Sequence, residues 1–133
     1  MPALFLFRGL IMIENKVIAI DFDGTITKEN LYPDIGEFRE NAVECIKKLQ
    51  EHNNCFLFTC RQGKALMNAV QSLLDKGVCI DLFSPYDFDV AFGRKPIADY
   101  YIDDRAMFDK EPDWYEIEKF FYVFFELKKP FSY

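Results

Sequence analysis

Apolar positions along the chain alternate between short β-branched runs and longer stretches with helical spacing. Short apolar runs bounded by turn residues are typical of buried strands, and apolar residues three and four positions apart are typical of amphipathic helices. We expect strands at residues 16–21, 55–59, 78–82 and 100–103, and a first helix over residues 36–52. A second helix is marked by Leu66, Ala69, Val70, Leu73 and Leu74, and Gly77 is placed to end it. A last helix is marked by Trp114, Ile117, Phe120 and Phe121, and Pro112 is placed to begin it.

Strands that alternate with helices indicate an α/β protein. The expected fold is Rossmann-like, a three-layer α/β/α arrangement with a central parallel sheet and no cap domain. Ligands of such sheets bind beyond the carboxyl ends of the strands. Asp21, Thr59 and Asp103 each close a predicted strand, so the pattern predicts that they share one site.

Composition narrows the class of protein. The chain has 133 residues, half of them apolar and 29% charged, which suits one domain with one core. The net charge of −6 argues against a broad nucleic-acid-binding surface. The four cysteines lack the spacing of a zinc site, so we expect reduced thiols and a cytoplasmic protein.

We assign residues 16–133 to a single domain and residues 1–15 to an N-terminal extension without an assigned role. The apolar stretch at residues 1–13 is shorter than the roughly 20 residues that a membrane-spanning helix needs. It also lacks the basic region and cleavage site of a signal peptide, so no membrane contact is predicted. The aromatic run at residues 120–125 is expected to pack into the core, and a dimer interface there stays open.

The strongest chemical signal is the segment DFDGTIT, which begins at Asp21 and directly follows a predicted buried strand. Two carboxylates at such a place need partners or a metal ion, since an apolar core disfavours both. One carboxylate can attack a phosphate ester and form an aspartyl-phosphate, while a cation neutralises the encounter of the two anions. A second carboxyl group can protonate the leaving group and later activate water. Asp21 suits the first role and Asp23 the second, and Gly24 would let the backbone turn beside the phosphate.

This segment resembles the first motif of the haloacid dehalogenase superfamily, whose phosphatases carry Asp-x-Asp after the first strand. The second motif, a Ser or Thr after the second strand, is matched by Thr59. The third motif, a lysine, is matched by Lys95, and the fourth, an acidic pair after a later strand, by Asp103 and Asp104. Residues 32–37, 60–63 and 112–114 also resemble a group of short, uncharacterised bacterial and phage hydrolases in this superfamily.

The resemblance implies a magnesium-dependent phosphohydrolase. Mg²⁺ would be held by Asp21, the backbone carbonyl of Asp23 and Asp104. Asp103 would support Asp104 without binding the metal directly, and the alternative in which Asp103 binds the metal and Asp104 supports it stays open. Thr59 and nearby backbone N–H groups would hold the phosphate, and Lys95 would pair with the nucleophile and the phosphate. The expected substrate contacts also include Phe22, Gly24, Thr25, Cys60 and Arg61.

Some alternatives stay open. Arg94 or Lys64 could replace Lys95, and Arg61 could form a salt bridge with an acidic residue instead of meeting a second anionic group on the substrate.

The stretches before and after Thr59 are too short for a cap, so the site should be open, with residues 28–37 and 86–92 at its rim. In this superfamily an open site is associated with bulky substrates, or with homo-oligomers that supply a lid.

The expected substrate is therefore a phosphorylated small molecule or a macromolecular phosphate ester. One rival is a receiver-like phosphoacceptor domain, although receivers carry their acidic pair on the first strand. Another is dehalogenase or ion-pump-like chemistry, whose members lack an aspartate at the position of Asp23. The third is a catalytically inactive module that binds phosphate or metal.

Overall fold

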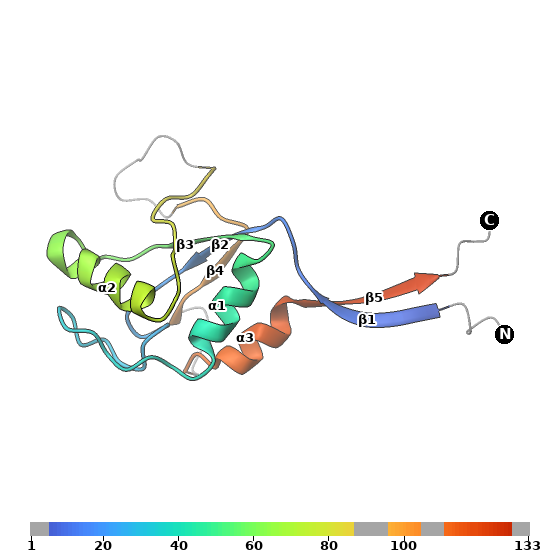
Figure 1. The fold of residues 1–133 in the computed structure, drawn as a ribbon, viewed down its shortest axis with the longest axis horizontal. Helices are drawn as coiled ribbons and strands as arrows, with labels where there is room; N and C mark the ends of the chain where they lie inside the picture. The colour runs from blue at the N-terminus through green and yellow to red at the C-terminus, as the bar shows by residue number, and fades with distance from the viewer. Residues whose placement is uncertain (1–5, 87–95, 105–110, 129–133) are drawn as a thin grey trace.

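The protein is a small α/β domain built on a three-stranded parallel sheet (Figure 1). The computed structural model describes residues 6–86, 96–104 and 111–128. The sheet has the order β3-β2-β4, and its strands are β2 (Val17–Ile20), β3 (Asn54–Leu57) and β4 (Tyr100–Ile102). The helices are α1 (Ala42–Gln50), α2 (Gly63–Asp75) and α3 (Trp114–Phe121). The prediction of an α/β fold with a parallel sheet is confirmed.

The strand register brings three chain segments to one edge of the sheet. Ile20, the last residue of β2, lies opposite both Leu57 of β3 and Ile102 of β4. All four residues of β2 are buried, as expected for a central strand with two neighbours. The residues that follow the three strands therefore leave the sheet at the same level.

The core has two parts, one on each face of the sheet. The larger cluster contains Ile18 and Ile20 of β2 together with buried residues from all three helices. Val17 and Ala19 point to the other face, because side chains alternate along a strand. They form a smaller cluster with Phe56. A second layer of helices is not found among the described residues, and residues 87–95 lie outside them.

Helix α1 shows how the apolar pattern determines packing. Its buried residues recur at helical spacing and are Ala42, Val43, Cys45, Ile46 and Leu49. The helix begins six residues later than predicted, because Phe38 makes an antiparallel bridge with Thr27 and Asn41 has a left-handed backbone, with φ of 64°. The segment at residues 36–41 is therefore a connection and not a helical turn.

The predicted strand at residues 78–82 is wrong. Asp81 makes only an isolated parallel bridge with Phe56, and its carbonyl oxygen accepts a 2.7 Å hydrogen bond from the backbone of Leu57. The sequence predicted the end of α2 and the start of α3 more accurately. Gly77, with φ of 86°, follows the end of α2. The side chain of Asp113 accepts hydrogen bonds from the first turn of α3, directly after Pro112.

A two-stranded antiparallel ribbon extends away from the sheet (Figure 1). It pairs β1 (Leu6–Met12) with β5 (Tyr122–Lys128), from Leu6 opposite Lys128 to Met12 opposite Tyr122. The sequence did not predict this pairing. The aromatic run was expected to pack into the core, but only part of it does so, because Phe121 is buried and Phe120 is 68% exposed.

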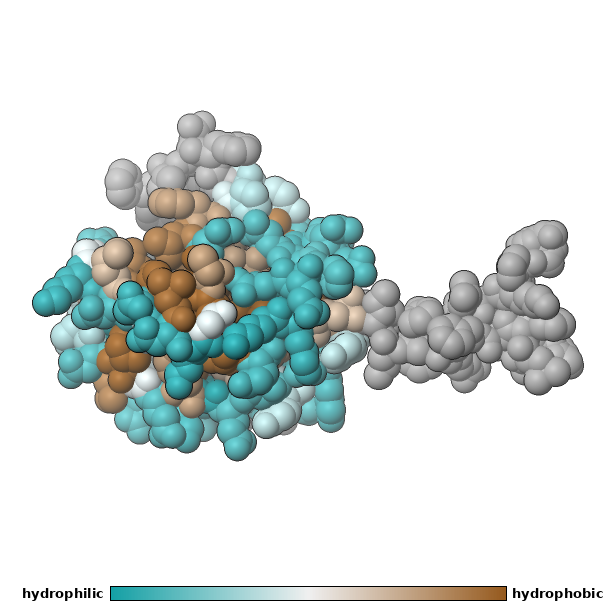
Figure 2. Space-filling view, viewed as in Figure 1, coloured by the Kyte–Doolittle hydropathy of each residue, from teal (hydrophilic) through white to brown (hydrophobic). Residues whose placement is uncertain are grey.

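The surface of the protein carries both hydrophilic and hydrophobic regions. Hydrophilic residues dominate the face seen in Figure 2, and hydrophobic residues gather on the half of this face where α2 lies. Among the described residues, none of the helices combines the length and apolar character that crossing a membrane requires.

Candidate active site

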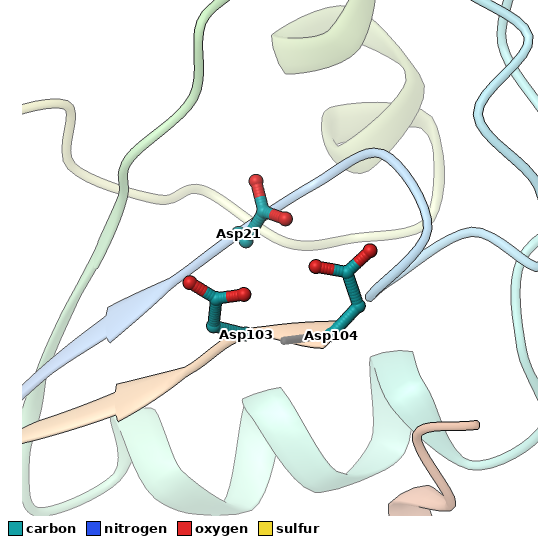
Figure 3. A group of neighbouring side chains, drawn as sticks. All are labelled: Asp21, Asp103 and Asp104. Carbon is teal, nitrogen blue, oxygen red and sulfur yellow. The ribbon is translucent and has the colours of Figure 1, made fainter. Parts of the chain in front are cut away.

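Three carboxylates meet at the carboxyl edge of the sheet. Asp21 directly follows β2, and Asp103 and Asp104 directly follow β4. The backbone N–H of Asp21 donates a 2.9 Å hydrogen bond to the carbonyl oxygen of Ile102, which ties the two strand ends together. Each aspartate offers an oxygen within 4.8 Å of the others, and Figure 3 shows the three side chains grouped between the two strand ends. The structure thus brings together three of the residues that the sequence singled out.

This carboxylate cluster suits a hard divalent cation. Carboxylate oxygens are preferred ligands of Mg²⁺, and two oxygens bound to one Mg²⁺ at about 2.1 Å lie about 3 to 4 Å apart. Separations of up to 4.8 Å are slightly wider, so small side-chain rotations would complete the contacts. The type and number of donors therefore fit the ion that the resemblance implies.

The cluster also changes the acidity of Asp21. The pKa of Asp21 is raised to about 6, mainly by burial and also by the neighbouring charges of Asp103 and Asp104. Hydrogen bonds from the Phe22 backbone and the Thr25 hydroxyl act in the opposite direction and limit this rise. A cation among these carboxylates would relieve the repulsion and favour the ionised form of Asp21.

The turn after Asp21 is shaped around the cluster. Gly24 has φ of 80°, and a Cβ atom on it would lie 3.0 Å from Oδ2 of Asp104, so a larger residue would strain the backbone and displace the Asp104 side chain. The hydroxyl of Thr25 donates a 3.1 Å hydrogen bond to Oδ2 of Asp21. Because Thr25 is fully buried, its side chain orients Asp21 and does not face a substrate.

Asp23 does not join the three-carboxylate cluster in the structure. Its side chain forms a two-pronged ion pair with Arg61, in which Nε donates to Oδ2 and Nη2 donates to Oδ1, both at 2.7 Å. The two side chains are only 11% and 1% exposed. Paired geometry of this kind fixes the direction of the carboxylate as well as its charge. The predicted metal contact of Asp23 involves its backbone carbonyl. The ion pair uses only the side-chain oxygens, so it does not test that prediction.

Arg61 is fully engaged with the protein. Besides its two bonds to Asp23, it donates to the backbone carbonyls of Pro33, Asp34 and Ala65, so all five of its N–H groups have acceptors. The expected contact with a second anionic group on the substrate is therefore wrong in this arrangement. The salt-bridge alternative describes what Arg61 does.

The other residues expected at the site occupy different environments. Thr59 is half-buried beyond the end of β3, and its Oγ1 accepts a 3.1 Å hydrogen bond from the backbone of Arg61. Cys60 is exposed beside it. The side chain of Phe22 is completely buried in the core, so only its backbone could contact a substrate.

The lysine of the site is not placed. Lys95 and its alternative Arg94 lie outside the described residues, as does most of the predicted rim segment at residues 86–92. The other alternative, Lys64, is exposed in the first turn of α2.

Two supporting residues were missed by the sequence analysis. The indole Nε1 of Trp114 donates a 2.8 Å hydrogen bond to the carbonyl of Thr25, and Nη2 of Arg39 donates a 3.0 Å bond to the carbonyl of Gly24. Both side chains hold the backbone of the turn that carries the first motif. Nothing in the local sequence marks these contacts, because they depend on how distant elements pack.

Comparison with known proteins gives one informative match. No protein-family model matches the chain, and no curated protein matches it. A solved structure described as the conserved protein coded by a locus of Bacteroides thetaiotaomicron is 36% identical, with a TM-score of 0.66. The match covers 80% of this chain and 88% of the other. The chain therefore belongs to the same family as this conserved Bacteroides protein.

Proposed function

We propose that this protein is a magnesium-dependent phosphohydrolase of the haloacid dehalogenase type that acts on phosphate monoesters through a phosphorylated Asp21. The observation that carries the proposal is the convergence of Asp21, Asp103 and Asp104 at the carboxyl edge of a parallel sheet. Ligand sites of such sheets lie at this edge. The turn that begins at Asp21 also supplies a second carboxylate, Asp23, held in a fixed direction by Arg61.

In the first step, an oxygen of Asp21 would attack the phosphorus, and the bond from phosphorus to the ester oxygen would break. The proton that the leaving oxygen needs would come from Asp23, which must first take up a proton from solvent after one of its two hydrogen bonds with Arg61 opens. Bound Mg²⁺ would supply charge neutralisation for the phosphate and the carboxylates. Thr25 would keep Asp21 aimed at the phosphorus through the 3.1 Å hydrogen bond.

In the second step, water would attack the phosphorus of the aspartyl-phosphate. Asp23 would accept the proton of this water, and the bond between phosphorus and Asp21 would break. Free phosphate and the original Asp21 carboxylate are then restored. The hydroxyl of Thr59, which lies beyond the same edge of the sheet, is available as a donor to a phosphate oxygen.

The test is hydrolysis of p-nitrophenyl phosphate with and without Mg²⁺, by the parent protein and by Asp21→Asn. We expect metal-dependent turnover in the parent and its loss in the variant, because the substitution removes the nucleophile but keeps the shape of the side chain. Asp75→Asn is a matched control, since Asp75 is an exposed aspartate at the end of α2. Equal activity of Asp21→Asn and the parent would overturn the mechanism.

A folded parent that binds Mg²⁺ without any turnover would overturn the proposed reaction. That result would favour the alternative of an inactive phosphate- or metal-binding module. Calorimetric titration with Mg²⁺ measures the binding independently of catalysis. In that case Asp21→Asn should weaken metal binding, because it replaces one of the three clustered carboxylates.

A further inference from the structure

The loop over residues 28–37 is fastened at its base and at its tip. At the base, the backbone N–H of Lys28 donates a 2.7 Å hydrogen bond to the carbonyl of Glu37, next to the bridge between Thr27 and Phe38. At the tip, the carbonyls of Pro33 and Asp34 accept hydrogen bonds of 3.0 and 2.6 Å from Arg61. The loop therefore has a fixed position relative to Arg61.

This loop presents an exposed aromatic ring. Tyr32 is 58% exposed, and its neighbour Leu31 is 46% exposed. The ring centroid of Tyr32 lies 5.3 Å from Cζ of Arg61, and the buried ring of Phe22 lies at the same distance from that atom. A contact between a guanidinium group and a ring stabilises the ring position. An exposed ring that is held in place can bind a ligand with little loss of side-chain entropy.

The position of Tyr32 relative to Asp23 follows from Arg61. The same guanidinium group contacts the ring of Tyr32 and holds both oxygens of Asp23. Under the proposed function, Asp23 lies on the side of the phosphate from which the leaving group departs. Tyr32 therefore presents its ring on the leaving-group side, next to the group that holds Asp23. The three clustered carboxylates lie around Asp21 and disfavour additional negative charge on the substrate.

We propose that Tyr32 is a specificity-determining residue, and that the preferred substrates are phosphate monoesters whose leaving group carries an aromatic ring that packs on it. This proposal rests on the proposed function. Arg61 acts as a positioning residue, because its contacts with both side chains fix the position of the Tyr32 ring relative to the Asp23 carboxylate. Ring stacking typically changes affinity by about 3- to 10-fold.

The test compares benzyl phosphate with methyl phosphate, since both release a primary alcohol and differ mainly in the ring. In the parent, KM should be lower for benzyl phosphate. Tyr32→Ala should reduce this preference by about 3- to 10-fold through KM, with the ratio of the two kcat values kept. Tyr32→Phe retains the ring and should restore the preference. Tyr115→Ala, at an exposed tyrosine on α3, is the matched control.

Binding without chemistry provides a second measurement. Titration calorimetry with benzylphosphonate and methylphosphonate in the presence of Mg²⁺ should show the same preference in the parent and its loss in Tyr32→Ala. An equal preference in the parent and in Tyr32→Ala would overturn the role of Tyr32, and so would the absence of any preference in the parent. Metal-dependent turnover that requires Asp21 would still stand in both cases, so failure of this inference is distinguishable from failure of the proposed function.

Discussion

The indole Nε1 of Trp114 donates a 2.8 Å hydrogen bond to the carbonyl oxygen of Thr25, 89 positions earlier in the chain. Thr25 in turn donates its hydroxyl hydrogen to Oδ2 of Asp21. All atoms of the first contact are buried, so the bond has no competition from water. The first turn of α3 thereby supports the backbone beside the proposed nucleophile.

We expect Trp114→Phe to destabilise the protein by roughly 2–4 kcal/mol, since it leaves the Thr25 carbonyl without its donor and opens space in the core. Urea unfolding followed by circular dichroism measures this change. Tyr115→Phe is the control, because Tyr115 is the next residue and is 54% exposed. It should change the free energy of unfolding by no more than about 0.5 kcal/mol. Similar losses in the two variants would contradict the importance of the buried hydrogen bond.

Two glycines with positive φ allow backbone strain to be separated from contact with the site. Gly24 and Gly63 have φ of 80° and 55°, but a Cβ on Gly24 would lie 3.0 Å from Asp104, whereas one on Gly63 would meet nothing within 4 Å. Both alanine variants should lose roughly 1–2 kcal/mol of stability from left-handed strain. Only Gly24→Ala should displace Asp104.

The measurement for these two variants is the Mg²⁺ concentration at half-maximal hydrolysis of p-nitrophenyl phosphate. We expect it to rise about tenfold or more in Gly24→Ala, since displaced metal-site residues typically lower metal affinity by this amount. It should stay near the parent value in Gly63→Ala. An unchanged metal requirement in Gly24→Ala would show that Asp104 is not confined by Gly24.

The sequence predicted the meeting of Asp21 with Asp103 because strand ends can be located from apolar runs, and the resemblance added Asp104. Once two parallel strands are adjacent, their register places the next residues at one edge. The pattern failed at residues 78–82, where the apolar character reflects burial of Val78 and Ile80 in the core and not a strand ladder. Apolar runs report burial, and only hydrogen bonding with a neighbour makes a strand.

The partners of Asp23 could not be predicted in the same way. An arginine two residues after Thr59 is equally compatible with a substrate contact or an ion pair, since both need only a nearby anion. The choice depends on the loop at residues 28–37, whose carbonyls at Pro33 and Asp34 satisfy two of the three remaining N–H groups of Arg61. The third donates to the carbonyl of Ala65. Contacts of this kind arise from tertiary packing and have no periodic signal in the sequence.

The acidity of Asp21 predicts a pH-dependent stability. Burial raises its pKa to about 6, above the value near 4 of an unfolded aspartate. The folded state therefore holds its proton more tightly, and this contribution to stability is present below about pH 4 and is lost as the pH rises through about 6. Without metal, Asp21→Asn should be more stable than the parent at pH 8, with the difference decreasing toward pH 4.

The measurement is urea unfolding of both proteins in EDTA between pH 4 and pH 8. Addition of Mg²⁺ at pH 8 should then stabilise the parent more than the variant, because only the parent retains all three carboxylates of the cluster. A parent that is more stable than Asp21→Asn at pH 8 in EDTA would contradict an unfavourable charge at this position.

The ion pair of Asp23 and Arg61 provides a double-mutant test. Arg61→Met removes all five N–H donors and leaves the carboxylate of Asp23, only 11% exposed, without its counter-charge. We expect a loss of about 3–5 kcal/mol in the free energy of unfolding, as is typical when one partner of a buried pair is removed. The exposed pair of Lys28 and Glu37, with side chains 51% and 77% exposed, is the control. Lys28→Met should cost no more than about 1 kcal/mol.

Combining Arg61→Met with Asp23→Leu should restore part of the lost stability, since no unpaired charge then remains in the interior. Hydrolytic activity should not return, because the proposed function requires the carboxyl group of Asp23 for proton transfer. The two readouts therefore separate the structural role of the pair from its catalytic role. A double variant that is no more stable than Arg61→Met would show that the lost carbonyl contacts at Pro33, Asp34 and Ala65 dominate, and that the charge of Asp23 contributes little.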